Sequence, residues 1–372
     1  MVRPKSSTFR SPERQPGTIH LTPWDLRMLI VDYNQKGVLL PKPPAAVAQG
    51  VVDRLASSLA RALGRFFPLV GRLAVNDHGD SAGQTISLCY SDEGAEFVHA
   101  VAPGVTVADV TALLCIPRVV WPFFRRSVDG GYDCEISSPL PVFDRWFPDG
   151  CAVPIPVPLG KLDDIVGLRR RAYAQRPPGQ ECFLRFSGES VKELVSKANA
   201  EMSGSGATIS SLQAVLAHLW RAVCRAWRLA PEEGTRYVIQ VGCRGRVDGV
   251  TAAYSGNAVS LAAADSTAGE VLEKGLGRAA WLLNRAVASF DGAREREELA
   301  TWAREPASGC RRRSRGAQAL ARCCGAGNKV SHKATAYEGG CGAGSIALEV
   351  CLAPDALARL VADHEFMSAT VP

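Results

Sequence analysis

The chain has 372 residues, of which 47% are hydrophobic and 22% charged, with 43 Lys plus Arg against 37 Asp plus Glu. This length favours two domains, and the composition is ordinary for a globular protein. Five of the arginines lie between residues 309 and 324, so the remainder is close to neutral and offers no general surface for nucleic acid. No apolar run reaches the roughly 18 residues that cross a bilayer, so we expect no membrane partner.

The twelve cysteines follow no disulfide or zinc pattern, because no C-x-x-C pair occurs and Cys323–Cys324 has no paired histidines nearby. Cys89, Cys224 and Cys351 lie in apolar runs and are interpreted as small buried side chains. We therefore expect no metal site, and a reducing, cytoplasmic environment.

In chain order, LTPWDLRMLIVDY (21–33) begins the first expected helix. The clearest helical stripe of apolar residues is in VVDRLASSLARALGRFFPLVGRL (51–73), where Pro68 ends the helix. TISLCY (85–90) alternates as a strand, and EFVHAVA (96–102) is a second candidate strand.

Residues 139–180 are rich in proline, which neither a helix nor a central strand accommodates. This segment is interpreted as a crossover between two halves. We divide the chain into an N-terminal lobe (1–150), a proline-rich linker (151–180) and a C-terminal lobe (181–372).

The C-terminal lobe is expected to begin with a strand at 181–186 and an amphipathic helix at 188–202. A long, mostly buried helix follows at 209–229, for which Ser210 and Ser211 are both candidate N-caps.

TRYVIQVGCRGRV (235–247) is expected to be a strand that leads into a polar turn, and YSGNAVSLAAA (254–264) is expected to enter another strand. A further strand is expected at 344–352, with helices at 269–290 and from Pro354 to Phe366. Strands alternate with helices in both lobes, so the predicted fold class is α/β with two lobes joined by a linker.

Several blocks of sequence carry a family resemblance: HLTPWDLRMLIVDYNQKGVLLPKPP, LARALGRFFPLVGRL, LPVFDRWFPDG, ISSLQAVLAHLWRAVCRA, GCRGRV with YSGNAVSLA, and the C-terminal run from GAGNKVSHKATAYEGG onward. In this order, and over most of the chain, they resemble the plant BAHD acyltransferases, which use acyl-CoA to acylate alcohols or amines. The resemblance implies a two-lobed α/β fold of the chloramphenicol-acetyltransferase type, with a tunnel between the lobes. It also implies direct acyl transfer, with acyl-CoA as co-substrate and neither a metal nor a tightly bound cofactor.

The catalytic motif of that family, H-x-x-x-D, supplies a histidine as general base. It is absent here, since no histidine has an aspartate four positions later, among His20, His78, His99, His218, His332 and His364. In the family the motif lies between the blocks that here read VVWPFFR and ISSPLPVFDRWF, and only RSVDGGYDCE (126–135) joins these two. We therefore expect an incomplete N-terminal lobe, with the catalytic-loop segment missing near 125–135.

The second family motif, D-F-G-W-G, is structural and is also absent; GCRRRSRGAQALARCC (309–324) stands in its place. One interpretation is a GC-rich coding stretch read in a shifted frame, and another is a solvated loop. A nucleic-acid-binding arm would require interleaved aromatic residues, which the stretch lacks, so no nucleic-acid partner is expected.

For CoA, the resemblance points to Arg244, Arg246, Gly256, Asn257 and Lys329. Arginine and lysine form charge-assisted hydrogen bonds with phosphate groups, which CoA carries. The alternative is that GCRGR is only the polar end of a strand.

Three other polar residues have structural interpretations. His218 follows the apolar spacing of its helix and is interpreted as a satisfied core histidine, whereas Asp144 and Arg145 are expected to anchor the linker.

By family, we expect an acyl-CoA-dependent acyltransferase that acts as a cytoplasmic monomer on a hydroxyl or amine of a plant secondary metabolite. Loss of a general base costs roughly 10²–10⁴ in rate, so this chain is expected to be inactive or weak. Three alternatives stay open: an active enzyme misrepresented by its gene model, a pseudoenzyme that binds CoA or a partner, and a binder of polyanions through the basic segment 309–324.

Overall fold

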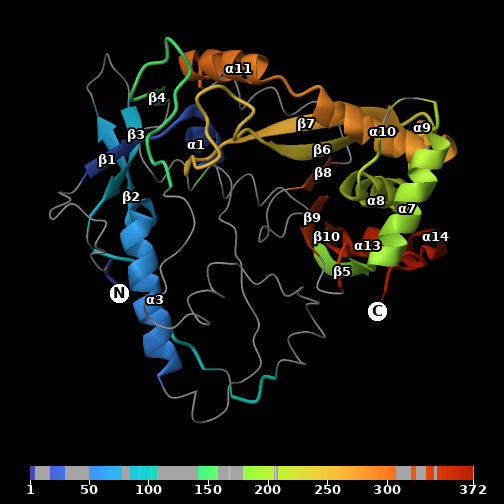
Figure 1. The fold of residues 1–372 in the computed structure, drawn as a ribbon, viewed down its shortest axis with the longest axis horizontal. Helices are drawn as coiled ribbons and strands as arrows, with labels where there is room; N and C mark the ends of the chain where they lie inside the picture. The colour runs from blue at the N-terminus through green and yellow to red at the C-terminus, as the bar shows by residue number, and fades with distance from the viewer. Residues whose placement is uncertain are drawn as a thin grey trace.

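The computed structural model describes residues 1–4, 17–29, 50–77, 84–91, 93–101, 103–106, 141–157, 167, 179–204, 206, 208–306, 320–323, 332–338 and 342–371. These residues form two sheets that lie at opposite sides of the molecule (Figure 1). The first has four strands and the second six. Helix α11 (Gly292–Arg304) runs along the top edge of the molecule, from the side of the first sheet toward the helices of the second.

The first sheet, called the N-terminal sheet below, is antiparallel. Its strands are β1 (Gly17–His20), β3 (Gln84–Tyr90) and β2 (Arg72–Asp77), in that spatial order, and β4 (Pro156–Val157) also pairs with β3. The strand predicted at 85–90 is thereby confirmed.

Two helices accompany the N-terminal sheet. Helix α1 (Pro23–Met28) begins at a capping box, in which the Thr22 hydroxyl accepts from the Asp25 amide and the Asp25 carboxylate accepts from the Thr22 amide. Helix α3 (Val51–Arg65) gives way to a short 3₁₀ helix, η1 (Phe67–Val70), because Pro68 cannot continue an α-helix.

Two N-terminal predictions need correction. The helix expected to stop at Pro68 ends slightly earlier, at Arg65, and Pro68 belongs instead to η1. The candidate strand at 96–102 is wrong for residues 96–101, none of which pairs as a strand among the described residues. A single short bridge nearby, Val2 to Ala95, ties the described N-terminus to this region.

The second sheet, the C-terminal sheet, has the spatial order β5-β10-β9-β8-β6-β7. Its strands are β5 (Gln180–Phe186), β6 (Gly234–Gly242), β7 (Val259–Thr267), β8 (Leu320–Cys323), β9 (Lys333–Glu338) and β10 (Ile346–Leu352). Strand β8 runs parallel to both of its neighbours, and the other pairings are antiparallel.

Strand β8 lies inside the arginine-rich segment 309–324. The solvated-loop interpretation is therefore wrong for Leu320–Cys323, whose backbone pairs with Arg236–Ile239 on one side and with Lys333 and Ala334 on the other. These four residues occupy the gap between β6 and β9, where the backbone groups of both strands need partners.

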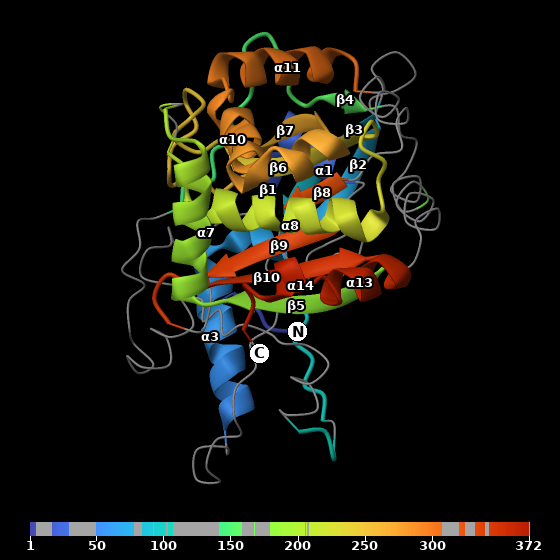
Figure 2. The same ribbon diagram turned by 90° about the vertical axis from the view of Figure 1, so that its right-hand side faces the viewer.

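One face of the C-terminal sheet is covered by helices (Figure 2). They are α7 (Gly188–Glu201), α8 (Ser211–Trp227), α9 (Ala268–Glu273), α10 (Gly275–Ala288), α13 (Pro354–Val361) and α14 (His364–Met367). The predicted helix at 269–290 is divided at Lys274 and Gly275, where Gly275 takes a φ of +85°. The helix expected from Pro354 to Phe366 is also two helices, because Asp363 caps the second.

The start of α8 settles which serine is the cap. The Ser210 hydroxyl accepts from the Gln213 amide, and the Gln213 side chain accepts from the Ser210 amide. Ser210 is therefore the N-cap and Ser211 the first helical residue.

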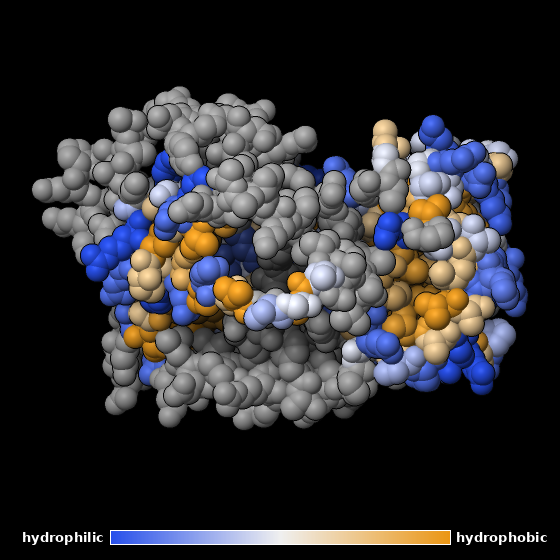
Figure 3. All heavy atoms as spheres, turned by 90° about the horizontal axis from the view of Figure 1, so that it is seen from below, coloured by the Kyte–Doolittle hydropathy of each residue, from blue (hydrophilic) through white to orange (hydrophobic). Residues whose placement is uncertain are grey.

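No helix in the described part of the chain is long and apolar enough to span a bilayer. Seen from below, apolar side chains gather in patches at both ends of the molecule (Figure 3).

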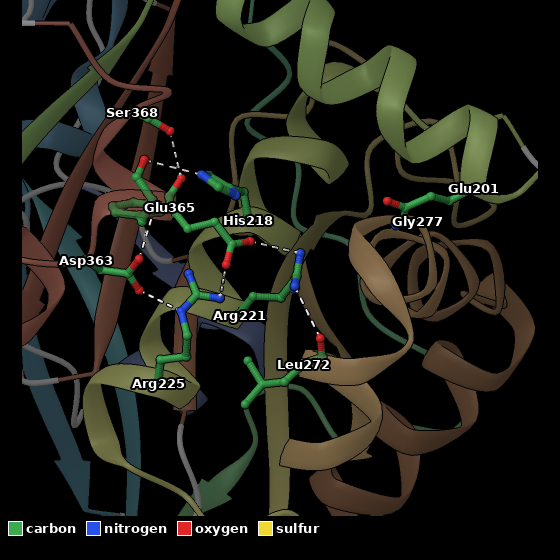
Figure 4. A network of polar contacts seen from close by, with 10 residues as sticks. Glu201, His218, Arg221, Arg225, Leu272, Gly277, Asp363, Glu365 and Ser368 are labelled. Atoms are coloured by element: carbon green, nitrogen blue, oxygen red, sulfur yellow. Dashed lines mark hydrogen bonds and ion pairs between the residues drawn. The ribbon is translucent and has the colours of Figure 1, made fainter.

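A network of polar contacts docks α14 onto α8 (Figure 4). Arg225 Nε lies 2.6 Å from Asp363 Oδ2, and Arg221 and Arg225 lie 3.3 and 3.1 Å from the two carboxylate oxygens of Glu365. His218 is buried, with Nε2 3.3 Å from the Phe366 carbonyl oxygen and its ring packed on the Phe366 ring. The interpretation of His218 as a satisfied core histidine is confirmed.

Candidate functional site

The loop between β6 and β7, residues 243–258, contains most of the residues singled out for CoA. Its ends are held by the Cys243 amide, which donates to the Ala258 carbonyl at 2.9 Å. Gly245 and Gly249 take positive φ angles of 70° and 83°, which allow the chain to reverse in tight turns. The Gly245 amide then donates to the Val250 carbonyl at 2.7 Å, so the first part of the loop is closed on itself.

Arg244 uses its guanidinium inside this loop. Its Nε donates to the Tyr254 carbonyl at 2.8 Å and its Nη2 donates to the Gly256 carbonyl at 2.7 Å. Two charge-assisted bonds to main-chain oxygens fix the two arms of the loop relative to each other. Arg244 thus shapes the loop, although its side chain is also exposed to solvent.

Gly256 has no room for a side chain. A Cβ atom there would lie 2.3 Å from Tyr254 Oη and 2.4 Å from Arg145 Nη1. Glycine at this position lets the side-chain ends of Arg145 and of Tyr254 approach the backbone closely, and a larger residue would have to displace them. This contact supports the interpretation of Arg145 as an anchor of the linker.

Asn257 points toward the N-terminal part of the chain. Its Nδ2 donates to the Trp24 carbonyl of α1 at 3.1 Å. Arg246 is exposed; its backbone amide donates to the Cys243 carbonyl at 3.0 Å, but its guanidinium makes no hydrogen bond or ion pair with the residues that the structure describes. The fifth candidate, Lys329, lies outside the described residues. The structure therefore brings Arg244, Gly256 and Asn257 together in one loop, with Arg246 at its surface.

The segment 142–146 packs along the same loop. The Val142 amide donates to the Ala253 carbonyl at 2.9 Å, and the Ser255 amide donates to the Val142 carbonyl at 2.7 Å. Trp146 Nε1 donates to the Asp248 carbonyl at 3.0 Å. The loop is consequently the place where the segment 142–146, α1 and the C-terminal sheet meet.

Buried titratable groups around the loop are held neutral. Burial raises the pKa of the Cys243 thiol to about 12, and the nearby Glu295 carboxylate adds to the rise. Burial also raises the pKa of Tyr254, helped by the negative charge of Asp25. Neither group is ionised at neutral pH, so neither serves there as a nucleophile or base.

One buried carboxylate of this region was missed in the sequence. Glu295 of α11 is 5% exposed and accepts a hydrogen bond from Trp24 Nε1 at 3.0 Å. Its neighbours in AREREELA are charged, which is typical of an exposed helix face. No sequence signal separates Glu295 from them, apart from its spacing of four residues to the buried Leu299.

Comparison with known proteins identifies the family. The family model described as "Transferase family" matches residues 2–133 and 180–318. The chain belongs to the BAHD acyltransferase family. An uncharacterized acetyltransferase of Arabidopsis thaliana is 29% identical over 82% of this chain and 78% of its own length. Agmatine hydroxycinnamoyltransferase 1 of Oryza sativa subsp. japonica is 39% identical over 67% of this chain and 65% of its own length.

A longer alignment shows that BAHD relatives carry residues this chain lacks. The BAHD acyltransferase DCR of Arabidopsis thaliana is 24% identical over 426 aligned positions, which cover 94% of this chain and 88% of the relative. Because this chain has only 372 residues, part of that alignment places the relative's residues opposite gaps in this chain.

Solved structures confirm the predicted fold class. TRI101 of F. sporotrichioides, in complex with coenzyme A and T-2, has a TM-score of 0.66 at 16% identity, over 95% of this chain and 98% of that one. Vinorine synthase has a TM-score of 0.51 at 16% identity, over 99% and 96% of the two chains. The fold of this BAHD member is therefore the two-lobed α/β fold of the chloramphenicol-acetyltransferase type.

None of the histidines that the structure describes is arranged as the BAHD base. His20 is half-buried, and its Nδ1 has no hydrogen-bond partner in the described part of the chain. His218 packs in the core, His332 packs edge-on against Trp227 at 4.8 Å, and His99 and His364 are exposed. Burial lowers the pKa of both His218 and His332. Among the described residues, none of the histidines hydrogen-bonds to a carboxylate, and no group of three or more His, Cys, Asp or Glu could hold a metal.

Proposed function

We propose that this BAHD chain has kept the ability to bind acyl-CoA but transfers acyl groups to a hydroxyl or an amine weakly or not at all. The observation that supports the first part is the ordered 243–258 loop, in a chain whose fold neighbours were solved with coenzyme A. The observation that supports the second is the absence of H-x-x-x-D from the sequence. Without a base, the acceptor must lose its proton unaided while it attacks the thioester carbonyl.

Within the CoA site, we assign different roles to the candidate residues. Arg244, Gly256 and Asn257 build the loop, because their polar groups or close contacts are directed at the protein. Arg246 is the exposed cation of the loop and would contact a phosphate group of CoA. Lys329 completes the proposed set as a second cation.

The acceptor and donor are proposed from the relatives. Agmatine hydroxycinnamoyltransferase 1 and putrescine hydroxycinnamoyltransferase 1 of Oryza sativa subsp. japonica are 39% and 27% identical to this chain. The names of these two relatives specify a hydroxycinnamoyl donor and an amine acceptor. An aromatic acyl-CoA and a small amine are therefore the first pair to assay, with a phenolic alcohol as the second acceptor.

We also propose a division into an N-terminal lobe over 1–150, a linker over 151–180 and a C-terminal lobe over 181–372, and a cytoplasmic monomer without a resident cofactor. The N-terminal lobe would be incomplete near 125–135, where the family carries its catalytic loop. A pseudoenzyme that binds CoA or a partner is the second candidate function, favoured by the same missing motif.

The test measures binding and turnover on the same protein. The purified 372-residue chain is titrated with CoA by calorimetry and incubated with a hydroxycinnamoyl-CoA plus agmatine, with products detected by mass spectrometry. We expect CoA binding, with a rate roughly 10²–10⁴ below that of the rice relative assayed in parallel. The variant R246A should weaken CoA binding about tenfold, as expected for one charge-assisted bond.

The control is R294A, which removes an exposed arginine of α11 that pairs only with Glu298 in the described part of the chain. It should leave CoA affinity unchanged. A rate equal to that of the relative would contradict the proposed inactivity, and a chain that binds no CoA would overturn the proposed function. CoA binding without turnover would support the pseudoenzyme.

A further inference from the structure

The buried carboxylate of Glu295 joins three elements that are distant in sequence. Its Oε1 accepts from Trp24 Nε1 of α1 at 3.0 Å, and its Oε2 accepts from Ser260 Oγ of β7 at 2.5 Å. Trp24 is 1% exposed and Glu295 is 5% exposed, so the bond between them is buried, whereas the bond to Ser260 is partly buried.

This carboxylate has no basic partner among the described residues. A buried ionised carboxylate is costly unless hydrogen bonds or a cation compensate for its lost hydration. Here two neutral donors, an indole N–H and a hydroxyl, supply that compensation. A carboxylate has two oxygens that accept in fixed directions, so it fixes the distance between the two groups that donate to it.

Trp24 is held from a second side by the candidate CoA loop. Asn257 donates to the Trp24 carbonyl at 3.1 Å, whereas Glu295 accepts from the indole of the same residue. Asn257 and Ser260 are three residues apart, so α1 is connected twice to the same short segment. Asn257 bonds to α1 directly, and Ser260 is connected to α1 through Glu295. The Trp24 ring also packs on the Trp146 ring, with ring centroids 5.0 Å apart.

We propose that Glu295 is a positioning residue that locks α1 onto the segment 256–260, and that the CoA affinity of the neighbouring loop depends on this lock. The second clause rests on the proposed function. The lock acts through Asn257, which directly follows Gly256, and the Gly256 carbonyl is one of the two that Arg244 holds. If α1 is released, the loop loses its fixed position and must be ordered again when CoA binds.

The chain offers a matched pair of substitutions at one position. In E295Q the amide oxygen still accepts from Trp24, and the amide NH₂ donates to the Ser260 hydroxyl, which also accepts. In E295A both bonds are lost. E298A is the control, because Glu298 lies one turn away on α11 and is exposed. We expect E295A to weaken CoA binding about tenfold, E295Q less than about threefold and E298A not at all.

Hydrogen–deuterium exchange of the full chain without CoA reports on the lock independently. In E295A, the peptides over 20–29 and 254–262 should exchange faster than in the wild type, whereas E295Q and E298A should match it. If E295A does not fold, W24F removes the indole donor of the same bond and takes its place.

Unchanged exchange in E295A would overturn the proposal. Faster exchange in E295A with an unchanged CoA dissociation constant would also overturn it, and would leave Glu295 a purely structural residue. A wild-type chain that binds no CoA would overturn the proposed function and the CoA clause with it. The exchange data would still decide whether Glu295 locks α1.

Discussion

The N-terminal and C-terminal sheets differ in how they are packed. Among the described residues, 35 buried side chains form one continuous cluster around the C-terminal sheet and its helices, whereas six form the cluster at the N-terminal sheet. The smaller cluster includes Ile155 and Val157 from the linker and Ala303 from α11. The C-terminal sheet thus carries its own core, and the N-terminal sheet is stabilised in part by segments from later in the chain.

Exposed apolar side chains follow the same division. Leu69, Val98 and Val101 of the N-terminal part are each at least 70% exposed, whereas the exposed apolar residues of the C-terminal helices and sheet are at most 46% exposed. The comparison shows that burial in one part of this chain depends on the other. Loss of the C-terminal core should therefore also unfold the N-terminal sheet.

The largest effect is expected from L216A. Leu216 is 1% exposed in the middle of α8, so truncation leaves a cavity and should cost about 2–5 kcal/mol in the free energy of unfolding. Leu212 lies on the same helix but is 43% exposed, so L212A is the matched control and should change stability by less than about 0.5 kcal/mol. Denaturant unfolding followed by circular dichroism measures both.

Hydrogen exchange at several denaturant concentrations tests whether the N-terminal sheet unfolds together with the C-terminal core. In L216A, peptides over 84–90 and over 215–226 should lose protection at the same, lowered denaturant concentration. An N-terminal sheet that keeps its wild-type protection while α8 opens would show that the two parts unfold independently.

A smaller effect is expected at the start of α8. S210A removes the hydroxyl that caps the Gln213 amide and should cost about 1 kcal/mol. S211A changes an exposed residue of the first turn whose hydroxyl does not cap the helix, so its effect on stability should be close to zero. Thermal unfolding of the two variants compares them directly, and equal losses would contradict the assignment of Ser210 as the cap.

The helices of the C-terminal part could be predicted because local signals agree with tertiary structure there. Apolar spacing predicts α7 and α8, and two serines mark the start of α8. The order of the strands could not be predicted, since LARC and KATAYE carry no strong alternation of apolar residues. Strand β8 exists because β6 and β9 leave a gap of one strand width between them.

The candidate site was only partly predictable for a related reason. Its motifs placed Arg244, Gly256 and Asn257 in one region of the sequence, and they do share a loop. Their partners are the Tyr254 and Trp24 carbonyl groups, which no residue pattern identifies because every residue has a carbonyl. Glu295 escaped notice because only the packing of α11 against α1 buries it.

The smallest effect concerns the pH dependence of the α8–α14 contact. Burial lowers the pKa of His218; the positive charges of Arg221 and Arg225 act in the same direction, while the Phe366 carbonyl and Glu365 oppose them. The folded state therefore binds fewer protons than the unfolded state below the ordinary histidine pKa of about 6.5. Stability should be fully present above about pH 7, decline as the pH falls through 6, and level off once the folded-state pKa is passed.

The variant H218Q isolates this titration. The Phe366 carbonyl only accepts, so neutral His218 carries its proton on Nε2, and the glutamine amide can donate from a similar position. Between pH 7 and 5 the melting temperature of the wild type should fall more than that of H218Q. Asp363 titrates outside this pH range. Burial raises its pKa, but the hydrogen bond from Arg225 and the other contacts of the carboxylate together outweigh burial, so the pKa of Asp363 is lowered overall. The stability that Asp363 contributes is therefore lost only below about pH 4. Parallel melting curves for the two proteins would show that His218 titrates equally in the folded and unfolded states.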